Sequence, residues 1–467
     1  MRRQMTKVRR GTMVQPWRKQ IPSTVRRLWS SLQASWVPTY LVGGAVRDLL
    51  RGVRPHDYDL ASRRTPEQVI AWAHRHQWRV IATGLRFGTV SLYDPRAPQC
   101  IIEHTTLRRE GRYHDGRHPE QVDWTDNIEE DLARRDFTIN ALALTWEGRL
   151  IDPYGGQKDL DRGIIACVGN AHRRLSEDPL RIWRAVRFVG MDHHGQPFQL
   201  AQSLQSAIGL LWPQLKRISV ERQRDELWRL LQTPHFGRAL WEAERFGLFV
   251  VIWPHWRMTQ GFVQRNQYHR YMLNHHLLYT AQEGPSPLLR LTGLLHDIGK
   301  PWTYTLDAKG QGHFYGHAET GAVLAKNLLE SLHFDHKTIK SVTALIAHHM
   351  YPWEQVEAKT LRRIAREWGD EHVQQLWILR KMDIIGAGYH THWAAEERVK
   401  RRWNEALSPS SSPTRLAING KDIMRWLHLS PGPEVGRWLK QVQQWVDDDP
   451  AINDPQILKE RILNAIK

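Results

Sequence analysis

The sequence predicts an α+β protein in which a small head with a mixed β-sheet precedes a mainly helical remainder. Between about residues 22 and 165, short apolar or alternating runs typical of strands are interspersed with amphipathic stretches typical of helices. From Ser176 on, apolar residues recur with helical periodicity instead. Because the chain has 467 residues, more than one core is needed, and usual domain sizes suggest about three or four units.

Within the head, helices and strands are expected to alternate. Helices are predicted over 21–35 and 65–76, the second with a capping signal at Thr65. The polar, glycine-containing segment Arg108–Val122 is expected to be a mobile loop. Strands are predicted over 40–44, 78–84, 89–94 and 100–108.

The remainder is expected to be helical. A Ser/Pro-rich linker at Leu407–Thr414 separates a small tail from the part before it. Amphipathic helices are predicted over 177–190, 201–212 and 220–232, and 262–395 is mostly helical as well. The predicted units are a basic arm at 1–21, a head at 22–165, a neck at 166–260, a body at 261–405 and a tail at 406–467.

The bulk composition favours a globular protein with a polyanionic partner. No run approaches the roughly 18 apolar residues of a membrane span, so no membrane partner is expected. The net charge of +17 favours a nucleic acid, since each neutralised phosphate releases counterions. A basic surface kept for solubility is the alternative. Only Cys100 and Cys167 are present, which excludes a disulfide framework and favours the reducing cytoplasm.

The segment Leu41–Ala61 carries the most informative pattern. An apolar strand start runs into Gly43 and Gly44, and Asp57 and Asp59 follow two residues apart. Alternate residues of a strand point to the same face, so both carboxylates project near a glycine turn whose backbone can approach a phosphate. Oxygen ligands of this kind suit Mg²⁺ and a nucleoside triphosphate. A tight turn with two solvated acids is the alternative.

A second pattern joins two arginines to an aspartate. Arg134 and Arg135 abut Asp136, and Asn140 follows four residues later, one helical turn away. A guanidinium can clamp triphosphate oxygens as a bidentate donor, while Asp136 and Asn140 can hydrogen-bond a ribose hydroxyl. Taken alone, the pattern is equally typical of a charged helix start with a salt bridge.

A third pattern places Asp178, Arg181, Arg184 and Arg187 at intervals of three residues, along one face of a helix. Such a ladder is usually a solvated face, but the acid at its head allows a specific role. A carboxylate accepts from the exocyclic amino group of cytosine or adenine, and a guanidinium donates to the neighbouring ring atoms. Uracil and guanine would leave the carboxylate unpaired at a cost of ~1–3 kcal/mol, which is enough for useful discrimination.

A separate constellation of histidines and aspartates lies further along the chain. Imidazole and carboxylate ligands together suit Ni²⁺, Mn²⁺, Fe²⁺ or Mg²⁺. His275 competes with His276 for the first ligand position. The four candidate ligands are His276, His296, Asp297 and Asp383. Further histidines in the same stretch are His317, His348 and His349.

Together these motifs resemble the signatures of the class II branch of the tRNA nucleotidyltransferase / poly(A) polymerase family. The string RRDFTINAL is nearly identical to the family's second signature, and the resemblance covers nearly the whole chain from about residue 22. It implies a polymerase-β-like nucleotidyltransferase head, a helical neck, a body that resembles the HD-type metal phosphohydrolases, and a tail that contacts tRNA.

The resemblance implies a CCA-adding tRNA nucleotidyltransferase, which extends tRNA from CTP and ATP without a nucleic-acid template. Asp57 and Asp59 would then bind Mg²⁺ and be the catalytic residues. The implied nucleotide-binding residues are Gly44, Arg47 and Arg135 for the triphosphate, Asp136 and Asn140 for the ribose, Asp178 and Arg181 for the base, and Arg184 and Arg187 for phosphate or base. Glu103 is a candidate third carboxylate, although a plain exposed strand residue is nearly as consistent with the sequence.

Several alternatives stay open. The loop Arg108–Val122 matches the family's flexible loop, and its completeness favours addition of the final A. A bacterial poly(A) polymerase, or an A-adding enzyme with a separate CC-adding partner, shares the head motifs. A phosphohydrolase with a degenerate head belongs to another class. The HD site itself is either an active phosphatase or cyclic phosphodiesterase for RNA 3′ ends, or a remnant that contacts tRNA. The oligomeric state is not given by the sequence.

Overall fold

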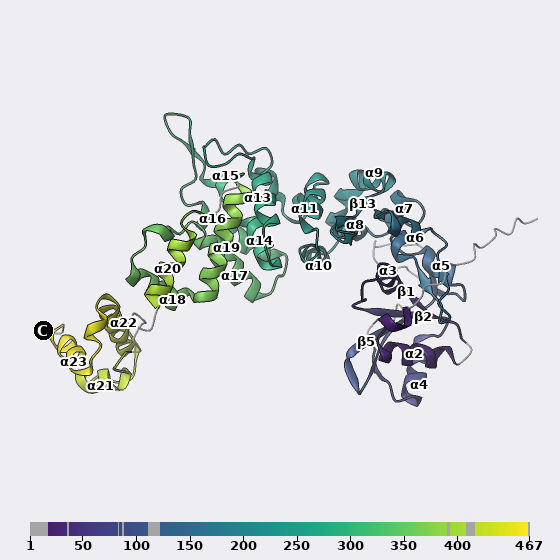
Figure 1. Ribbon diagram of the computed structural model, residues 1–467, viewed down its shortest axis with the longest axis horizontal. Coiled ribbons are helices and arrows are strands. Elements are labelled where there is room, and N and C mark those ends of the chain that lie inside the picture. The colour runs from purple at the N-terminus through teal and green to yellow at the C-terminus, as the bar shows by residue number, and fades with distance from the viewer. Residues whose placement is uncertain are drawn as a thin grey trace, which may run out of the picture. The chain divides into compact units, whose positions relative to one another are not determined.

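The computed structural model divides into two compact units, one up to Pro254 and one from His255 (Figure 1). It describes residues 17–34, 37–82, 84–85, 88–110, 122–389, 393–407 and 416–465. Most of the expected basic arm, the middle of the expected loop Arg108–Val122 and nearly all of the Ser/Pro linker lie outside these residues. No helix in the described part of the chain combines the length and the apolar character needed to cross a bilayer.

The first unit contains a mixed β-sheet, as the sequence predicts. Its seven strands are β1 (Thr39–Val42), β2 (Tyr58–Ser62), β3 (Arg79–Ile81), β4 (Thr89–Asp94), β5 (Ala97–Thr106), β8 (Ala143–Leu144) and β9 (Leu150–Ile151). They follow the order β3-β4-β5-β2-β1-β8-β9. β2 is antiparallel to β1 and parallel to β5, so three strands far apart in sequence lie side by side at the centre of the sheet.

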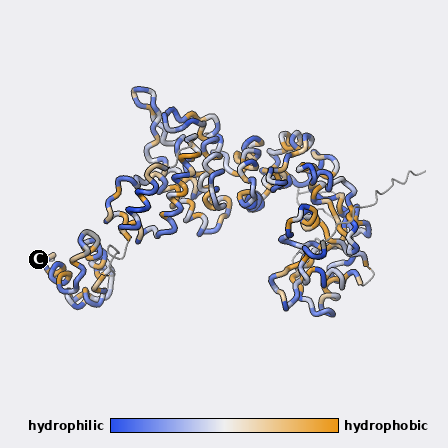
Figure 2. The backbone as a smooth tube through the Cα atoms, viewed as in Figure 1, coloured by the Kyte–Doolittle hydropathy of each residue, from blue (hydrophilic) through white to orange (hydrophobic). Residues whose placement is uncertain are grey.

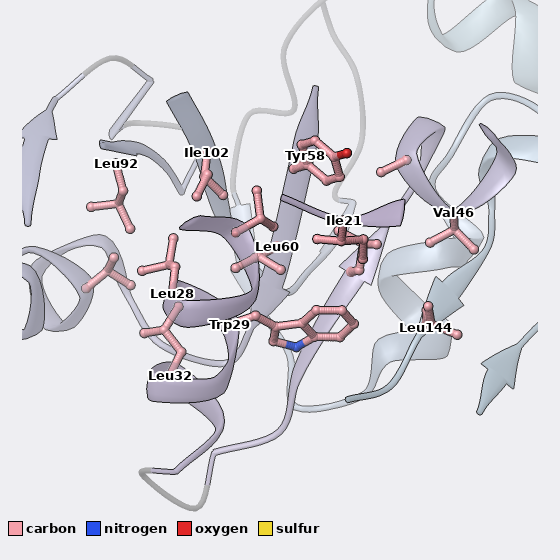
Figure 3. Packing of buried hydrophobic residues seen from close by; sticks show 14 of the residues in the cluster. Ile21, Leu28, Trp29, Leu32, Val46, Tyr58, Leu60, Leu92, Ile102 and Leu144 are labelled. Atoms are coloured by element: carbon pink, nitrogen blue, oxygen red, sulfur yellow. The ribbon is translucent and has the colours of Figure 1, made fainter. Parts of the chain in front are cut away.

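The head core forms where helices cover this sheet. Its helices are α1 (Trp17–Gln20), α2 (Ser23–Gln33), α3 (Gly44–Leu50), α4 (Pro66–Arg75), α5 (Ile128–Ala133) and α6 (Gly156–Asp161). Leu28, Trp29 and Leu32 of α2 point into the core toward Leu60 of β2 (Figure 3), the spacing of a helix with one apolar face. The Trp29 indole also donates a hydrogen bond to the Thr39 carbonyl at 2.8 Å, which ties α2 to β1.

The segment Arg108–Val122 corrects the prediction of a loop from end to end. Its first residues form β6 (Arg108–Glu110), which pairs antiparallel with β7 (Val122–Trp124). The two ends of the segment therefore pair as strands as far as Glu110 and Val122, although the polar composition predicts a loop there. Residues 111–121 lie outside the described part, so the expectation about the completeness of the loop stays a prediction.

The neck follows as a series of helices. These are α7 (Ala171–Glu177), α8 (Leu180–Val189), α9 (Gln202–Leu211), α10 (Val220–Leu230), α11 (Phe236–Arg245) and α12 (Leu248–Ile252). The prediction of one helix over 177–190 is wrong at its start. Asp178 is extended, with φ −143° and ψ 99°, because the following Pro179 disfavours the helical region for the residue before it. Asp178 thus lies at the joint between α7 and α8.

The second unit is almost entirely helical. Its helices are α13 (Leu273–Gln282), α14 (Pro287–Leu295), α15 (Lys300–Thr303), α16 (His317–Ser331), α17 (His336–His348), α18 (Ala358–Trp368), α19 (Asp370–Gly386), α20 (Glu396–Leu407), α21 (Gly420–Leu427), α22 (Pro433–Asp448) and α23 (Pro455–Asn464). The last three enclose a small apolar cluster of their own. Apolar stretches recur along these helices as they do through the centre of the head (Figure 2).

Candidate functional site

Three carboxylates gather at the centre of the head sheet. Asp59 lies in β2 with Val42 of β1 and Glu103 of β5 as its register neighbours, and exposed Asp57 stands just before β2. The pKa of Asp59 is raised to about 6, chiefly by burial; the Arg135 charge acts to lower it, and the charges of Glu103 and Asp57 act to raise it. Glu103 is thus close enough to act electrostatically on Asp59, as expected of a third carboxylate.

This group of acids fits a hard divalent cation. The three side chains offer only carboxylate oxygens, the ligand type that Mg²⁺ prefers. The raised pKa of Asp59 reflects burial and the negative charge around it, and an added positive charge relieves both effects. The residues present therefore match the metal that the sequence motif implies.

Gly43 lets an arginine lie against this acid cluster. It precedes α3 with φ +71°, a left-handed conformation that favours glycine. A Cβ atom at Gly43 would lie 2.6 Å from Arg135 Nη1 and 3.8 Å from Asp59 Oδ2. The bare turn is therefore a structural requirement for the close approach of Arg135 to Asp59.

Arg135 is held from behind by a buried acid. Asp131 Oδ2 lies 3.5 Å from Arg135 Nη2, and Asp131 Oδ1 lies 2.9 Å from Arg134 Nη2. Arg135 Nε is buried and has no hydrogen-bond partner among the described residues. Arg135 Nη1 instead faces the turn at Gly43, where it can donate to a ligand, whereas Arg134 mainly supports the fold.

Asp136 and Asn140 come together, although not as the predicted helical turn. α5 ends at Ala133, and a short 3₁₀ turn covers Thr138–Asn140. Asn140 donates to Asp136 at 3.1 Å and accepts from Arg47 at 2.8 Å. Burial acts to raise the pKa of Asp136, but Arg184 and Asn140 outweigh it and hold this pKa below its ordinary value.

The arginine ladder of α8 is paired with acids. Arg184 Nη2 lies 2.6 Å from Asp136 Oδ2 of the head, and Arg187 Nε lies 2.6 Å from Glu226 Oε2 of α10. The guanidinium groups of Arg184 and Arg187 stand 5.7 and 4.3 Å from the centre of the Phe188 ring. The ladder is thus built into the protein and is not a solvated face.

Asp178 and Arg181 lie near each other but have separate partners. Asp178 Oδ2 accepts from Arg222 Nη2 of α10 at 3.1 Å. Arg181 is buried and lies 3.1 Å from Glu177 Oε2, and it also donates to the Arg174 carbonyl at 2.8 Å. The structure therefore leaves the Asp178 carboxylate more accessible than the Arg181 guanidinium.

Sequence reasoning missed the contribution of α10 to this site. Arg222 and Glu226 stand four residues apart, which brings them to one face of the helix. Glu226 is buried despite its charge, and buried charges are normally paired. This contribution could have been found from the sequence, because Glu226 is a charged residue on the apolar face of the predicted helix 220–232.

The four predicted ligands converge in the second unit. His276 Nε2 lies 3.1 Å from Asp297 Oδ2 and 3.3 Å from Asp383 Oδ1. His296 Nε2 lies 3.3 and 3.5 Å from the same two oxygen atoms. His276, in preference to the neighbouring His275, is the residue that faces the other three ligands. His269, which was not among the predicted ligands, also places a ring nitrogen within 4.8 Å of ligand atoms of His276, Asp297 and Asp383. Imidazole nitrogens and carboxylate oxygens at these separations fit a divalent cation of the Mn²⁺, Fe²⁺ or Ni²⁺ type.

Further residues around this cluster carry no signal in the sequence motifs. Buried Lys300 lies 2.5 Å from Asp297 Oδ2 and makes a hydrogen bond of 2.9 Å with His269 Nε2. The cluster adjoins a cavity of about 990 Å³ that Asp297 and Asp383 help to line. Its other lining residues include the cations Lys300 and Arg380 and the aromatic residues Tyr268, Phe314, Tyr315, Tyr351, Trp368 and Tyr389.

Comparison with known proteins yields matches along most of the chain. Residues 39–166 match the Poly A polymerase head domain, 197–258 the probable RNA and SrmB-binding site of polymerase A, and 270–387 the HD domain. An A-adding tRNA nucleotidyltransferase of Deinococcus radiodurans is 33% identical over 86% of this chain and 90% of its own length. A CCA-adding enzyme of Geobacillus kaustophilus is 32% identical over 91% of each chain. The crystal structure of the Bacillus stearothermophilus CCA-adding enzyme in complex with CTP matches with a TM-score of 0.64 and 27% identity, covering 97% of this chain and 99% of that one.

The first prediction concerns Gly43. Gly43→Ala should strain the backbone by roughly 1–2 kcal/mol and push Arg135 away from Asp59. A displacement of about 1 Å at a reacting centre costs roughly 100-fold in rate, so kcat/KM for nucleotide incorporation should fall by about that factor. Gly52→Ala is the matched control, because Gly52 has φ +70° and no other group lies within 4 Å of the place where its Cβ would stand. Equal losses in both variants would show that backbone strain, and not contact with Arg135, is responsible.

The second prediction concerns the pairing of Asp136 with Arg184. Asp136→Asn leaves Arg184, whose side chain is 32% exposed, without its ion-pair partner and should reduce local stability by about 1–3 kcal/mol, measured by hydrogen exchange of the amides of residues 137–142. Because the pKa of Asp136 is lowered in the folded state, its contribution is present above the unfolded-state value of about 3.9 and is lost as pH falls through the folded-state value. The difference from the unmodified protein should thus be full at pH 7 and smaller at pH 3.

Asp225→Asn provides the control for this experiment. The Asp225 side chain is 54% exposed and pairs with Arg224 at 2.7 Å on the surface of α10. A surface pair of this kind contributes less than about 1 kcal/mol. Protection that responds equally to both substitutions would contradict a special role for the buried pair.

Proposed function

The chain belongs to the tRNA nucleotidyltransferase family, and from this premise we propose that it completes tRNA 3′ ends with CCA, using CTP and ATP and no nucleic-acid template. The observation that carries the proposal is the convergence of Asp57, Asp59, Glu103 and Arg135 around the turn at Gly43. This group combines oxygen ligands for a cation with a guanidinium donor for phosphates. The proposal is further supported by relatives that are named CCA-adding enzymes.

In the proposed reaction, Asp57 and Asp59 are the catalytic residues and hold Mg²⁺, with Glu103 beside them. When bound, the cation neutralises charge at the attacking and leaving oxygens and so favours attack of the tRNA 3′-hydroxyl on the α-phosphate. Arg135, whose Nη1 lies against the turn at Gly43, offers its guanidinium to the triphosphate. Asp57 is exposed and Asp59 half-buried, so the acid pair is accessible to a nucleotide from solvent.

The remainder of the proposed nucleotide site adjoins this turn. Gly44 is the first residue of α3 and Arg47 lies one turn further along it, and both are proposed to bind the triphosphate. Asp136 and Asn140 are proposed to bind the ribose. Arg47 also donates to Asn140 Oδ1 at 2.8 Å, which leaves the amide nitrogen of Asn140 directed at Asp136. The ribose-binding pair is therefore oriented before the substrate arrives, which lowers the entropic cost of binding.

We propose that Asp178 is the main reader of the incoming base. Its carboxylate accepts from an exocyclic amino group, as cytosine and adenine provide, and Arg222 fixes its orientation at 3.1 Å. Arg181 serves as second reader only by exchanging its contact with Glu177 for the base. Arg184 and Arg187 act mainly through position, because each is already paired with a buried acid.

The third prediction tests the transferase. Purified protein is incubated with tRNA that ends at the discriminator base, Mg²⁺ and labelled CTP and ATP, and the 3′ ends are sequenced. Addition should stop at CCA. Asp57→Ala should lower incorporation by at least about 100-fold, since the reacting groups lose their alignment, while binding of tRNA stays nearly intact. Asp126→Ala removes a carboxylate that is 79% exposed and should leave incorporation unchanged.

The other outcomes identify different enzymes of the same family. Long A tracts would identify a poly(A) polymerase. Addition of A only to tRNA that already ends in CC would identify an A-adding enzyme, as the relative from Deinococcus radiodurans is named. No incorporation of any nucleotide would remove the transferase proposal.

The second unit supports a second function, metal-dependent hydrolysis of a phosphoester. We propose that His276, His296, Asp297 and Asp383 hold the cation, because their ligand atoms converge beside a cavity of about 990 Å³. The aromatic side chains that line this cavity can stack on a nucleobase. Lys300 and Arg380 supply positive charge for a phosphate.

The fourth prediction tests this hydrolase. Hydrolysis of a 2′,3′-cyclic nucleotide is measured with Ni²⁺, Mn²⁺, Fe²⁺ or Mg²⁺, and Asp383→Asn should abolish it while nucleotide addition by the head persists. Glu371→Gln changes an exposed acid in the same helix and should leave hydrolysis unchanged. A protein that hydrolyses nothing with any of the four cations would favour a body retained for contact with tRNA.

A further inference from the structure

Two largely buried arginines of the neck converge on the same acceptors beside the proposed base reader. Arg174 of α7 and Arg181 of α8 both contact Glu177 Oε2, at 2.9 and 3.1 Å. Both also donate to the carbonyl of Arg134, at 3.2 and 3.3 Å. Arg181 further donates to the carbonyl of Arg174 at 2.8 Å. The two shared acceptors therefore each keep a donor when one of the arginines leaves.

The main chain of the head holds Arg174 more firmly than it holds Arg181. Each nitrogen of the Arg174 guanidinium donates to a different carbonyl: Nε to Val168 at 3.3 Å, Nη1 to Arg134 at 3.2 Å and Nη2 to Ala133 at 2.7 Å. These carbonyls belong to the end of α5 and to the segment before α7. Arg174 would lose all three contacts by turning toward a nucleotide, whereas Arg181 would leave two acceptors that Arg174 also serves.

Glu177 makes this shared pairing important for the energetics of the site. Its side chain is only 17% exposed, so its charge depends on a partner. Arg173 pairs with the other oxygen, Oε1, at 3.1 Å from the surface of α7. While Arg174 stays in place, Oε2 also keeps its donor. The departure of Arg181 then leaves no unpaired oxygen on Glu177 and is correspondingly less costly.

Arg181 is well placed to add to base selection once it is released. It lies in the first turn of α8, and its amide donates to the carbonyl of Asp178, the proposed main reader, at 3.0 Å. Beside their exocyclic amino groups, cytosine and adenine present a ring nitrogen with a lone pair. In uracil and guanine the corresponding nitrogen carries a hydrogen. A guanidinium donor therefore favours cytosine and adenine at a second position of the base, because it would face another donor in the other two.

We propose that Arg174 is a positioning residue for base selection, which keeps Glu177 and the Arg134 carbonyl paired while Arg181 turns from them to the incoming base. The inference rests on the proposed nucleotide addition by the head, because Arg181 has a base to read only when a nucleotide binds there. Arg174 itself contacts no substrate and acts through Arg181. The alternative is a purely structural role, in which Arg174 caps the last carbonyls of α5.

The fifth prediction uses nucleotide discrimination by the full-length protein. The kcat/KM of single addition is measured with CTP and UTP on tRNA that ends at the discriminator base, and with ATP and GTP on tRNA that ends in CC. Both nucleotides of a pair carry the same triphosphate, so their kcat/KM ratio cancels effects on phosphate binding. Arg174→Gln should lower the ratio roughly 10- to 100-fold, the range expected when a hydrogen bond to a charged group is lost.

Further variants show whether Arg174 acts through Arg181. Arg181→Gln should lower the ratio about as much, and the double variant should lower it no further, because both residues serve one contact with the base. A purely structural residue would instead add its own effect to that of Arg181→Gln. Arg173→Gln is the matched control, since Arg173 pairs with the same Glu177 but its side chain is 84% exposed. This control should leave the ratio unchanged.

The outcomes separate this inference from the proposal beneath it. Nucleotide addition with an unchanged ratio in Arg174→Gln overturns the role of Arg174 and leaves the transferase standing, and additive losses in the double variant do the same. No incorporation by the unmodified protein overturns both. Where Arg174→Gln fails to fold, Arg181→Gln alone provides the test. A ratio that Arg181→Gln leaves unchanged shows that Arg181 reads no base, which contradicts the inference.

Discussion

The ion pair between Arg184 and Asp136 is the contact on which the proposed nucleotide site depends. It joins α8 of the neck to the head across 48 residues of sequence, with its shortest nitrogen–oxygen distance at 2.6 Å. Asp136 is buried, so without Arg184 its charge would stand unpaired in a medium that penalises it. Asn140 binds the other oxygen of Asp136 and connects it to Arg47. The head and the neck are thereby held together by one polar network.

The same region brings three arginine side chains close together with little electrostatic repulsion, because each is paired with an acid. Arg47, Arg184 and Arg187 all lie within 6 Å of the centre of the buried Phe188 ring, at 5.4, 5.7 and 4.3 Å. Three guanidinium groups so close together would repel one another if each were unpaired. They face Asp48, Asp136 and Glu226, respectively. The pairing fixes the arginines in place and leaves Asp178, held by Arg222, as the accessible group for the proposed selection of the base.

Local patterns in the sequence predicted the parts of the protein that depend on neighbouring residues. Helix α2, the central strands and the pair Asp57 and Asp59 follow from periodicity and short spacing. The extended conformation of Asp178 could also have been predicted, since Pro179 follows it. The partners of Arg184 and Arg187 were not, because 48 and 39 residues separate each arginine from its acid and no periodic rule links them. Likewise, nothing in the string AHHM tells His349, which faces Asp297, from His348, which stacks on Trp368.

The ligand atoms of the two proposed metal centres, one in the head and one in the body, would let each centre bind a different kind of cation in the same chain. The acids of the head offer only oxygen atoms, and such a site follows the abundance of Mg²⁺ because oxygen ligands give transition metals little advantage. The body offers imidazole nitrogen from His276 and His296. Nitrogen ligands raise affinity along the series from Mn²⁺ to Ni²⁺, so these ions are drawn to the second unit. In the proposed functions, the distribution of histidine, present at one centre and absent from the carboxylate group of the other, would sort the cations between nucleotide addition and hydrolysis.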